Sequence, residues 1–201
     1  ACLVVGFAVT SFAQGGFSKI KVVTGDLNFL KGEKMVNVQY DFSEMKVGGF
    51  DEEDYVSKKV EEKNKKEAGS GDKWKEAWEN DKTTKFEPKF EELMNKYLLD
   101  DSITVGQDTS GTNYTVILKT TFLEPGYNVG VSKKPAYINV DIIFVANSDP
   151  TKNLTKLVMT NVLGQGAMGY DYDTGYRISE AYAKCGKSLA AYIDKNIFNK
   201  K

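Results

Sequence analysis

Residues 136–146 read AYINVDIIFVA and form the segment that most strongly predicts a β-strand. One face of this strand would carry only apolar side chains, namely Ile138, Val140, Ile142 and Phe144. The opposite face is polar from Tyr137 to Asp141 and becomes apolar at Ile143 and Val145. Alternation with a period of two residues is typical of a sheet strand with one fully buried face. The rest of the chain is therefore interpreted around a β-sheet.

Further strand candidates lie on both sides of this segment. The strongest are residues 114–123 (YTVILKTTFL) and 154–163 (LTKLVMTNVL), and shorter ones lie at 18–25, 35–42 and 102–106. Turn-forming residues separate the later segments, such as NSDPTKN at 147–153, directly after the strand 136–146. Consecutive strands joined by short polar turns predict a mostly antiparallel meander.

Helical periodicity marks three other regions, at residues 51–66, 72–99 and 176–198. The last region has an apolar stripe at helical spacing, which is typical of a helix that packs on a sheet. An antiparallel sheet with one apolar face needs a cover, and amphipathic helices supply it. The predicted fold is thus a two-layer α+β domain with helices covering one face of the sheet. We expect a single domain over 14–201, with a helical insertion at about 51–99.

The beginning of the chain is interpreted as the remnant of a signal peptide, residues 1–13. Leu3 to Ala13 is apolar, uncharged and too short to span a bilayer, and Ser11 and Ala13 suit cleavage before Gln14. A lipoprotein motif ending at Cys2 stays an alternative, although a polar tether normally follows an anchored cysteine. The prediction is a periplasmic or secreted protein, with no later transmembrane segment.

Composition excludes several functional classes. Among 201 residues there is no histidine, the formal net charge is -1, and 41% of the residues are hydrophobic. Without histidine there is no Ser-His or Cys-His pair and no histidine metal ligand. A near-neutral chain whose only arginine is Arg177 argues against nucleic-acid binding. We predict no catalytic residue, no metal site and no cofactor.

A glycine- and tyrosine-rich stretch, residues 164–176 (GQGAMGYDYDTGY), is the best candidate for ligand contact. Its candidate binding residues are Gly164, Gly166, Gly169, Tyr170, Tyr172 and Tyr176. The GxGxxG spacing does not predict a dinucleotide site, because no second parallel strand can follow the last helix. Amphipathic tyrosines could contact a protein or a glycan, or could simply pack over the sheet edge.

Asp173 within this stretch and Cys185 after it have structural interpretations. Asp173 is expected to cap the last helix rather than to begin a calcium loop, because the third ligand position and the distal glutamate are missing. Cys185 falls in the apolar stripe of the same helix and is expected to be a small buried hydrophobe.

Trp74 and Trp78 are the remaining candidates for ligand binding. They lie four residues apart, so they share one helix face. Exposed rings would make a sugar-binding platform, whereas the alternative is a helix face packed on the sheet. Because the two tryptophans precede the strongest part of the apolar stripe, they are expected to be its most exposed members.

The order of features from Phe90 to Phe198 resembles the α+β domains of bacterial envelope proteins of the CsgG and TolB N-terminal type. The resemblance runs through FEELMNKYLLDD, NYTVILKTTFLE, YINVDIIFVANSDPTKNLTKL and the closing helix ISEAYAKCGKSLAAYIDKNI. The chain also looks similar to secreted proteins of gut-type bacteria with an SFAQ-like leader junction. The envelope resemblance implies assembly and protein contact in the cell envelope.

Together these features favour a non-enzymatic binding or envelope-assembly module. Its expected partner is another envelope protein, or further copies of itself in an oligomer. The alternatives are a glycan-binding module, using the tryptophans or the tyrosine stretch, and a glycan-active hydrolase that uses paired carboxylates.

Overall fold

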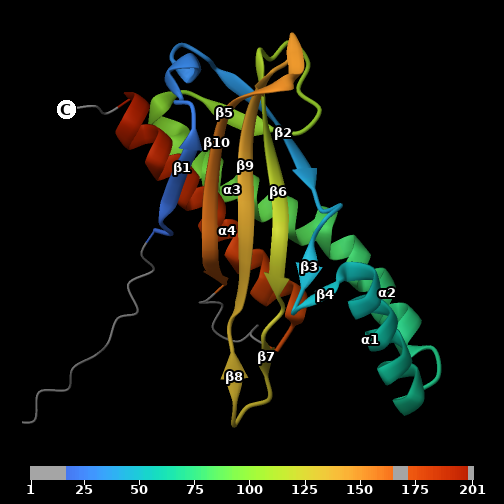
Figure 1. Cartoon of the computed structure of the whole chain (residues 1–201). Helices are drawn as coiled ribbons and strands as arrows, with labels where there is room; N and C mark the ends of the chain where they lie inside the picture. Colours follow the sequence, from blue (N-terminus) through green and yellow to red (C-terminus); the bar gives the residue numbers. More distant parts are fainter. Residues whose placement is uncertain (1–16, 165–171, 199–201) are drawn as a thin grey trace, which may run out of the picture.

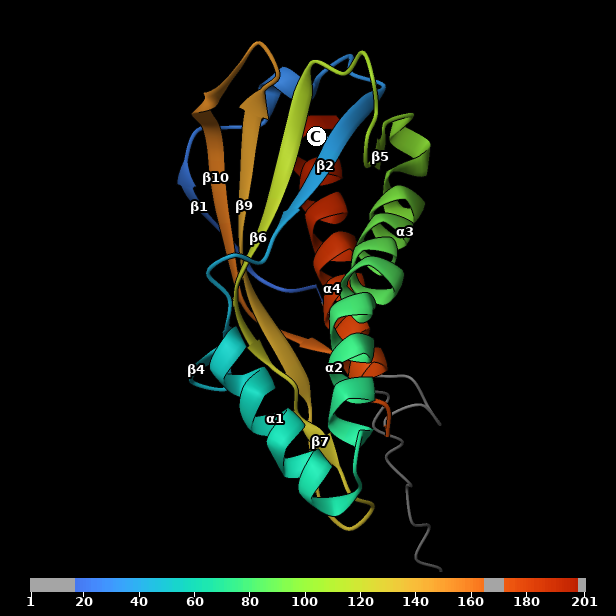
Figure 2. The ribbon, with the colours of Figure 1, turned by 90° about the vertical axis from the view of Figure 1, so that its right-hand side faces the viewer.

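The computed structural model describes residues 17–164 and 172–198 and shows an α+β fold (Figure 1). A twisted sheet forms one layer, and the helices α3 (Glu87–Leu98) and α4 (Thr174–Ile193) lie against one of its faces (Figure 2). The two-layer arrangement predicted from the sequence is confirmed.

The sheet has the strand order β1-β10-β9-β6-β2-β5. Its strands are β1 (Ile20–Thr24), β2 (Met35–Asp41), β3 (Lys46–Val47), β4 (Phe50–Asp51), β5 (Thr104–Gly106), β6 (Tyr114–Glu124), β9 (Ala136–Ala146) and β10 (Asp149–Gly164). Strands β7 (Tyr127–Asn128) and β8 (Lys133–Lys134) form a separate two-stranded sheet. The segment that opened the sequence analysis is β9, which lies in the middle of the sheet with the predicted bounds. Its four alternating apolar side chains are all buried, so the period-two pattern gave the correct inner face.

The sheet is mixed, so the expectation of an antiparallel meander is only partly right. Strands β6, β9 and β10 form the expected antiparallel meander, and β1 adds to β10 in the same sense. Strand β2, however, pairs in parallel with both β5 and β6. The chain between β2 and β6 contains the three α-helices α1 (Glu52–Lys66), α2 (Ser70–Asp81) and α3. This crossover returns the chain to the end of the sheet where β2 begins, so β6 runs parallel to β2.

The remaining helices precede β5. Helix α1 (Glu52–Lys66) and helix α2 (Ser70–Asp81) form a hairpin that extends from the body of the molecule (Figure 2). A π-helical turn, η2 (Lys82–Phe86), joins α2 directly to α3. Three further short helical segments are η1 (Asn28–Leu30) between β1 and β2, η3 (Leu99–Asp101) after α3, and the π-helical η4 (Asp194–Phe198) after α4.

The core lies between the sheet and the α3–α4 pair. Tyr182 of α4 is fully buried, and its ring stacks on Phe86 with centroids 5.2 Å apart and an interplanar angle of 2°. Its hydroxyl is 2.7 Å from the hydroxyl of Thr120 on β6, so the polar end of the ring is satisfied. Cys185, one turn further along α4, is buried as predicted. The contacts of Tyr182 fix the middle of α4 relative to η2 and to β6.

Candidate functional site

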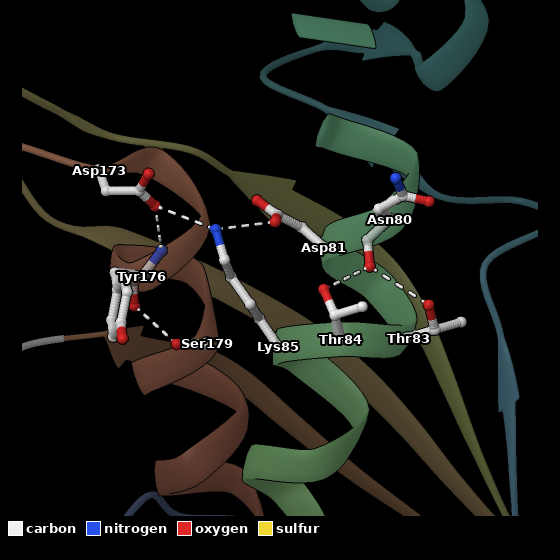
Figure 3. Close-up of polar contacts among 8 residues, drawn as sticks. All are labelled: Asn80, Asp81, Thr83, Thr84, Lys85, Asp173, Tyr176 and Ser179. Atoms are coloured by element: carbon white, nitrogen blue, oxygen red, sulfur yellow. Dashed lines mark hydrogen bonds and ion pairs between the residues drawn. The ribbon is translucent and has the colours of Figure 1, made fainter. Parts of the chain in front are cut away.

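The candidate site is the junction where η2 meets the first turn of α4. A π-helical turn inside a longer helix frequently marks a functional position, because the inserted residue disturbs the regular hydrogen-bond ladder. Here the hydroxyls of Thr83 and Thr84 donate to the carbonyl oxygen of Asn80 at 3.2 and 2.8 Å (Figure 3). Both threonine side chains are exposed at the surface.

Lys85 links the two elements electrostatically. Its Nζ atom lies 2.8 Å from a carboxylate oxygen of Asp81 on α2 and 3.5 Å from one of Asp173, just before α4 (Figure 3). Partial burial disfavours the charged ammonium, but the hydrogen bonds and negative charges of the two aspartates outweigh this and raise the pKa of Lys85. Lys85 therefore stays a cation that holds α2 and α4 together.

The first turn of α4 confirms the capping role predicted for Asp173. Its side chain accepts a hydrogen bond from the backbone nitrogen of Tyr176 at 2.8 Å, which satisfies one free donor of the helix end. Ser179 donates to the carbonyl oxygen of Tyr176 at 2.9 Å (Figure 3). The ring centre of Tyr176 lies 5.6 Å from the Lys85 ammonium, within the range of a cation–π contact.

The glycine- and tyrosine-rich stretch is only partly described. Gly166, Gly169 and Tyr170 lie outside the described residues. Gly164 is buried at the end of β10, where a Cβ atom would overlap the carbonyl oxygen of Arg177 on α4, so close packing accounts for this glycine. Tyr172 and Tyr176 are 69% and 38% exposed, which leaves both rings able to contact a partner.

The expected exposure of the two tryptophans is wrong for Trp78. It is only 4% exposed, and its indole nitrogen donates to Glu52 of α1 at 2.7 Å. Trp74 is partly buried, and its ring centre lies 5.5 Å from that of Trp78. The reason is that α1 folds back on α2, so that both rings pack against Tyr55. The burial of Trp78 removes one half of the predicted sugar platform.

A polar cluster that sequence reasoning missed lies between α3 and the sheet. Gln107 donates to Glu87 at 3.0 Å and to Glu91 at 3.1 Å, and the hydroxyl of Tyr40 donates to Glu91 at 3.0 Å. Burial raises the pKa of Glu87, the hydrogen bond from Gln107 opposes this shift, and the charge of Glu91 adds to it. The four-residue spacing of the two glutamates puts them on one helix face, but nothing in the sequence indicates that this face meets Tyr40.

A cleft of about 520 Å³ gathers carboxylates at the start of α1. Its acidic lining residues are Glu44, Asp51, Glu52 and Glu53. Three of them form ion pairs with lysines, in the pairs Glu44–Lys119, Asp51–Lys46 and Glu52–Lys82. Such ion pairs are typical of a structural network. They are not typical of the two carboxylates that catalyse glycoside hydrolysis.

Neither a metal-binding group nor a membrane-spanning helix is present among the residues that the structure describes. Residues 17–164 and 172–198 contain no group of three or more acidic, cysteine or histidine side chains that could hold a metal ion. Over the same residues, no helix has the length and apolar character needed to cross a bilayer.

The chain has only a weak likeness to known proteins. No protein-family model matches the chain, and no curated protein sequence matches it. Among solved structures, the chain is similar to the PelC dodecamer from Paraburkholderia phytofirmans, with a TM-score of 0.42 and 12% identity over 87% of this chain and 98% of that one. A single-residue variant of that protein gives a TM-score of 0.38 and 11% identity, over 84% and 96% of the two chains. A likeness at this level carries no argument about function.

Proposed function

We propose that this protein is an exported, non-enzymatic binding module that acts in the cell envelope through protein contacts. The observation that carries the proposal is the tyrosine surface, defined as Tyr172, Tyr176 and Lys85. Its two rings are exposed, while the Lys85 ion pairs and the Asp173 cap hold the supporting backbone in place. Exposed tyrosines on a rigid support are characteristic of protein-contact surfaces, because little side-chain freedom is lost on binding.

The chemically reactive side chains of α4 and η2 favour a binding role over a catalytic one. The thiol of Cys185 is fully buried, and burial raises its pKa, so the nucleophilic thiolate is disfavoured. Burial likewise raises the pKa of Tyr182. Lys85 is held as a cation between two aspartates, so its charge serves to hold the support of the two tyrosines in place.

A site-specific photo-crosslinking experiment tests the proposal. A benzophenone amino acid would replace Tyr176 in one version of the protein and Tyr97 in another, because both side chains are 38% exposed. We expect a discrete crosslinked product in native envelope from position 176 and none from position 97. A product at twice the chain mass would identify self-assembly, and a heavier discrete product would identify another envelope protein.

The crosslinking results at positions 176 and 97 can also contradict the proposal. Crosslinking that is absent at both positions, or equal at both, would remove the tyrosine surface as a protein-contact site. The glycan-binding alternative now depends on Tyr172 and Tyr176, because Trp78 is buried. Binding to a glycan array that is lost on Tyr172→Ala and kept on Tyr97→Ala would favour that alternative instead.

A further inference from the structure

The β7–β8 hairpin carries a concentration of exposed apolar side chains. It extends past the end of the main sheet, at the same end of the molecule as the α1–α2 hairpin (Figures 1 and 2). Within five residues, Tyr127 is 45% exposed, Val129 is 65% exposed and Val131 is 100% exposed. Single exposed apolar residues are common on protein surfaces, but here three lie together on a projecting tip.

This exposure belongs to an ordered hairpin. The backbone nitrogen of Val129 donates to the carbonyl oxygen of Ser132 at 3.0 Å, which closes the tip. At the base, Lys134 forms an ion pair with Glu124 at 2.8 Å. The buried side chain of Arg177 reaches from α4 to the carbonyl oxygen of Pro125 at 3.4 Å. The apolar side chains are therefore presented to the outside by a preorganised support.

Basic side chains accompany the apolar tip. Lys133 and Lys134 directly follow it, and within the described ranges Lys133 makes no ion pair. The last turn of α1, at the end of the neighbouring helical hairpin, adds Lys63, Lys65 and Lys66. Lys65 and Lys66 pair with glutamates of α1 but keep 71% and 73% of their side chains exposed. One end of a nearly neutral chain thus combines apolar side chains with Lys133, while three of the other lysines there are exposed but paired with glutamates.

We propose that this end of the molecule binds an anionic lipid surface, with the β7–β8 tip inserted among the headgroups. Val129 and Val131 enter the apolar boundary, Tyr127 lies at the interface, and Lys133 contacts the lipid phosphates. A narrow convex tip has little area for a flat protein interface, but a lipid surface deforms around it. Apolar insertion combined with neighbouring lysines is the usual basis of peripheral membrane binding. The inference is independent of the tyrosine surface.

Vesicle sedimentation with the full chain tests this inference. The probes are vesicles of phosphatidylcholine alone and of phosphatidylcholine with phosphatidylglycerol in equal parts. We expect binding to the anionic vesicles that weakens with added salt. Val131→Asp should reduce that binding by about tenfold or more, and Lys133→Glu should reduce it several-fold. The matched control is Leu99→Asp, because Leu99 is 74% exposed and lies in η3, beyond the far end of α3.

A second readout locates the contact. A tryptophan placed at position 131 should show blue-shifted fluorescence on anionic vesicles, and one at position 99 should not. Folding of each variant is checked by circular dichroism, and Val131→Asp should unfold like the parent chain because its side chain makes no buried contact. Absence of vesicle binding, or equal binding by Val131→Asp, would overturn the inference. Self-association abolished by Val131→Asp without lipid binding would also overturn it.

Discussion

Replacing Gly186 with alanine should destabilise the protein, because two helices meet closely at this position. A Cβ atom on Gly186 of α4 would lie closer than 3.0 Å to the carbonyl oxygen of Phe90 and 3.2 Å from the amide nitrogen of Met94, both in α3. These are backbone atoms of a regular helix, so they cannot rotate away. An ordinary contact of 3.4 Å would require α4 to move away from α3 by more than 0.4 Å.

The cost of that separation can be weighed against the gain in helix propensity. Overpacking of a core typically costs about 1–3 kcal/mol, and we expect the upper part of this range because backbone is involved. Alanine in place of glycine stabilises a helix by up to about 1 kcal/mol through its higher helix propensity. The expected net loss is about 2 kcal/mol, equivalent to a fall in Tm of roughly 4–8 °C for a chain of this size.

Urea unfolding followed by far-ultraviolet circular dichroism measures this difference, and Gly175→Ala is the matched control in the same helix. A Cβ on Gly175 would meet the side-chain ends of Asp81 and Lys85, which can move. The control should therefore lose less stability than Gly186→Ala, because the Asp81 and Lys85 side chains can shift whereas the backbone of α3 cannot. A Gly186→Ala protein as stable as the parent would refute the reasoning about the α3–α4 contact.

Three further predictions concern the site and the core. Asp173→Ala should lower the free energy of unfolding by about 1 kcal/mol through loss of the α4 cap, whereas Asp173→Ser should retain most of it in the same urea assay. Burial raises the pKa of Glu87 above 4.5, so the native state holds this proton more tightly than the unfolded chain. The contribution of Glu87 to stability should accordingly fall as pH rises above 4.5. Unfolding curves of the parent chain and of a Glu87→Gln protein should therefore differ in their pH dependence, and an identical dependence would contradict the assignment. The Cys185 thiol should react with a thiol reagent only at the rate of unfolding, and rapid labelling at neutral pH would show that its burial is wrong.

The sequence predicted the central elements well, because burial gives a strong periodic signal. Strand β9 has the predicted bounds, and Cys185 is buried on the apolar stripe of α4. It also predicted the Asp173 cap, since capping depends on residues close in the chain. The resemblance to CsgG and TolB N-terminal-type domains remains a prediction.

Other features depend on contacts that leave no local signal. The parallel pairing of β2 with β6 follows from the path of the helical crossover, and the alternation in β2 is the same in either direction. The Lys85 link to Asp173 joins residues 88 positions apart. The β7–β8 hairpin was not predicted from the sequence, because two-residue strands are too short for a periodic pattern.

The pairing of β1 with β10 also bears on when the protein can fold. The first strand finds its partner in the last one, with Ile20 opposite Met159. A chain synthesised from its N-terminus must therefore carry β1 unpaired until nearly all later residues have emerged. Contacts between distant residues slow folding, because loop closure must precede the gain from pairing. For the export that we propose, this delay would keep the chain extended while it crosses a membrane, because the sheet cannot be completed early.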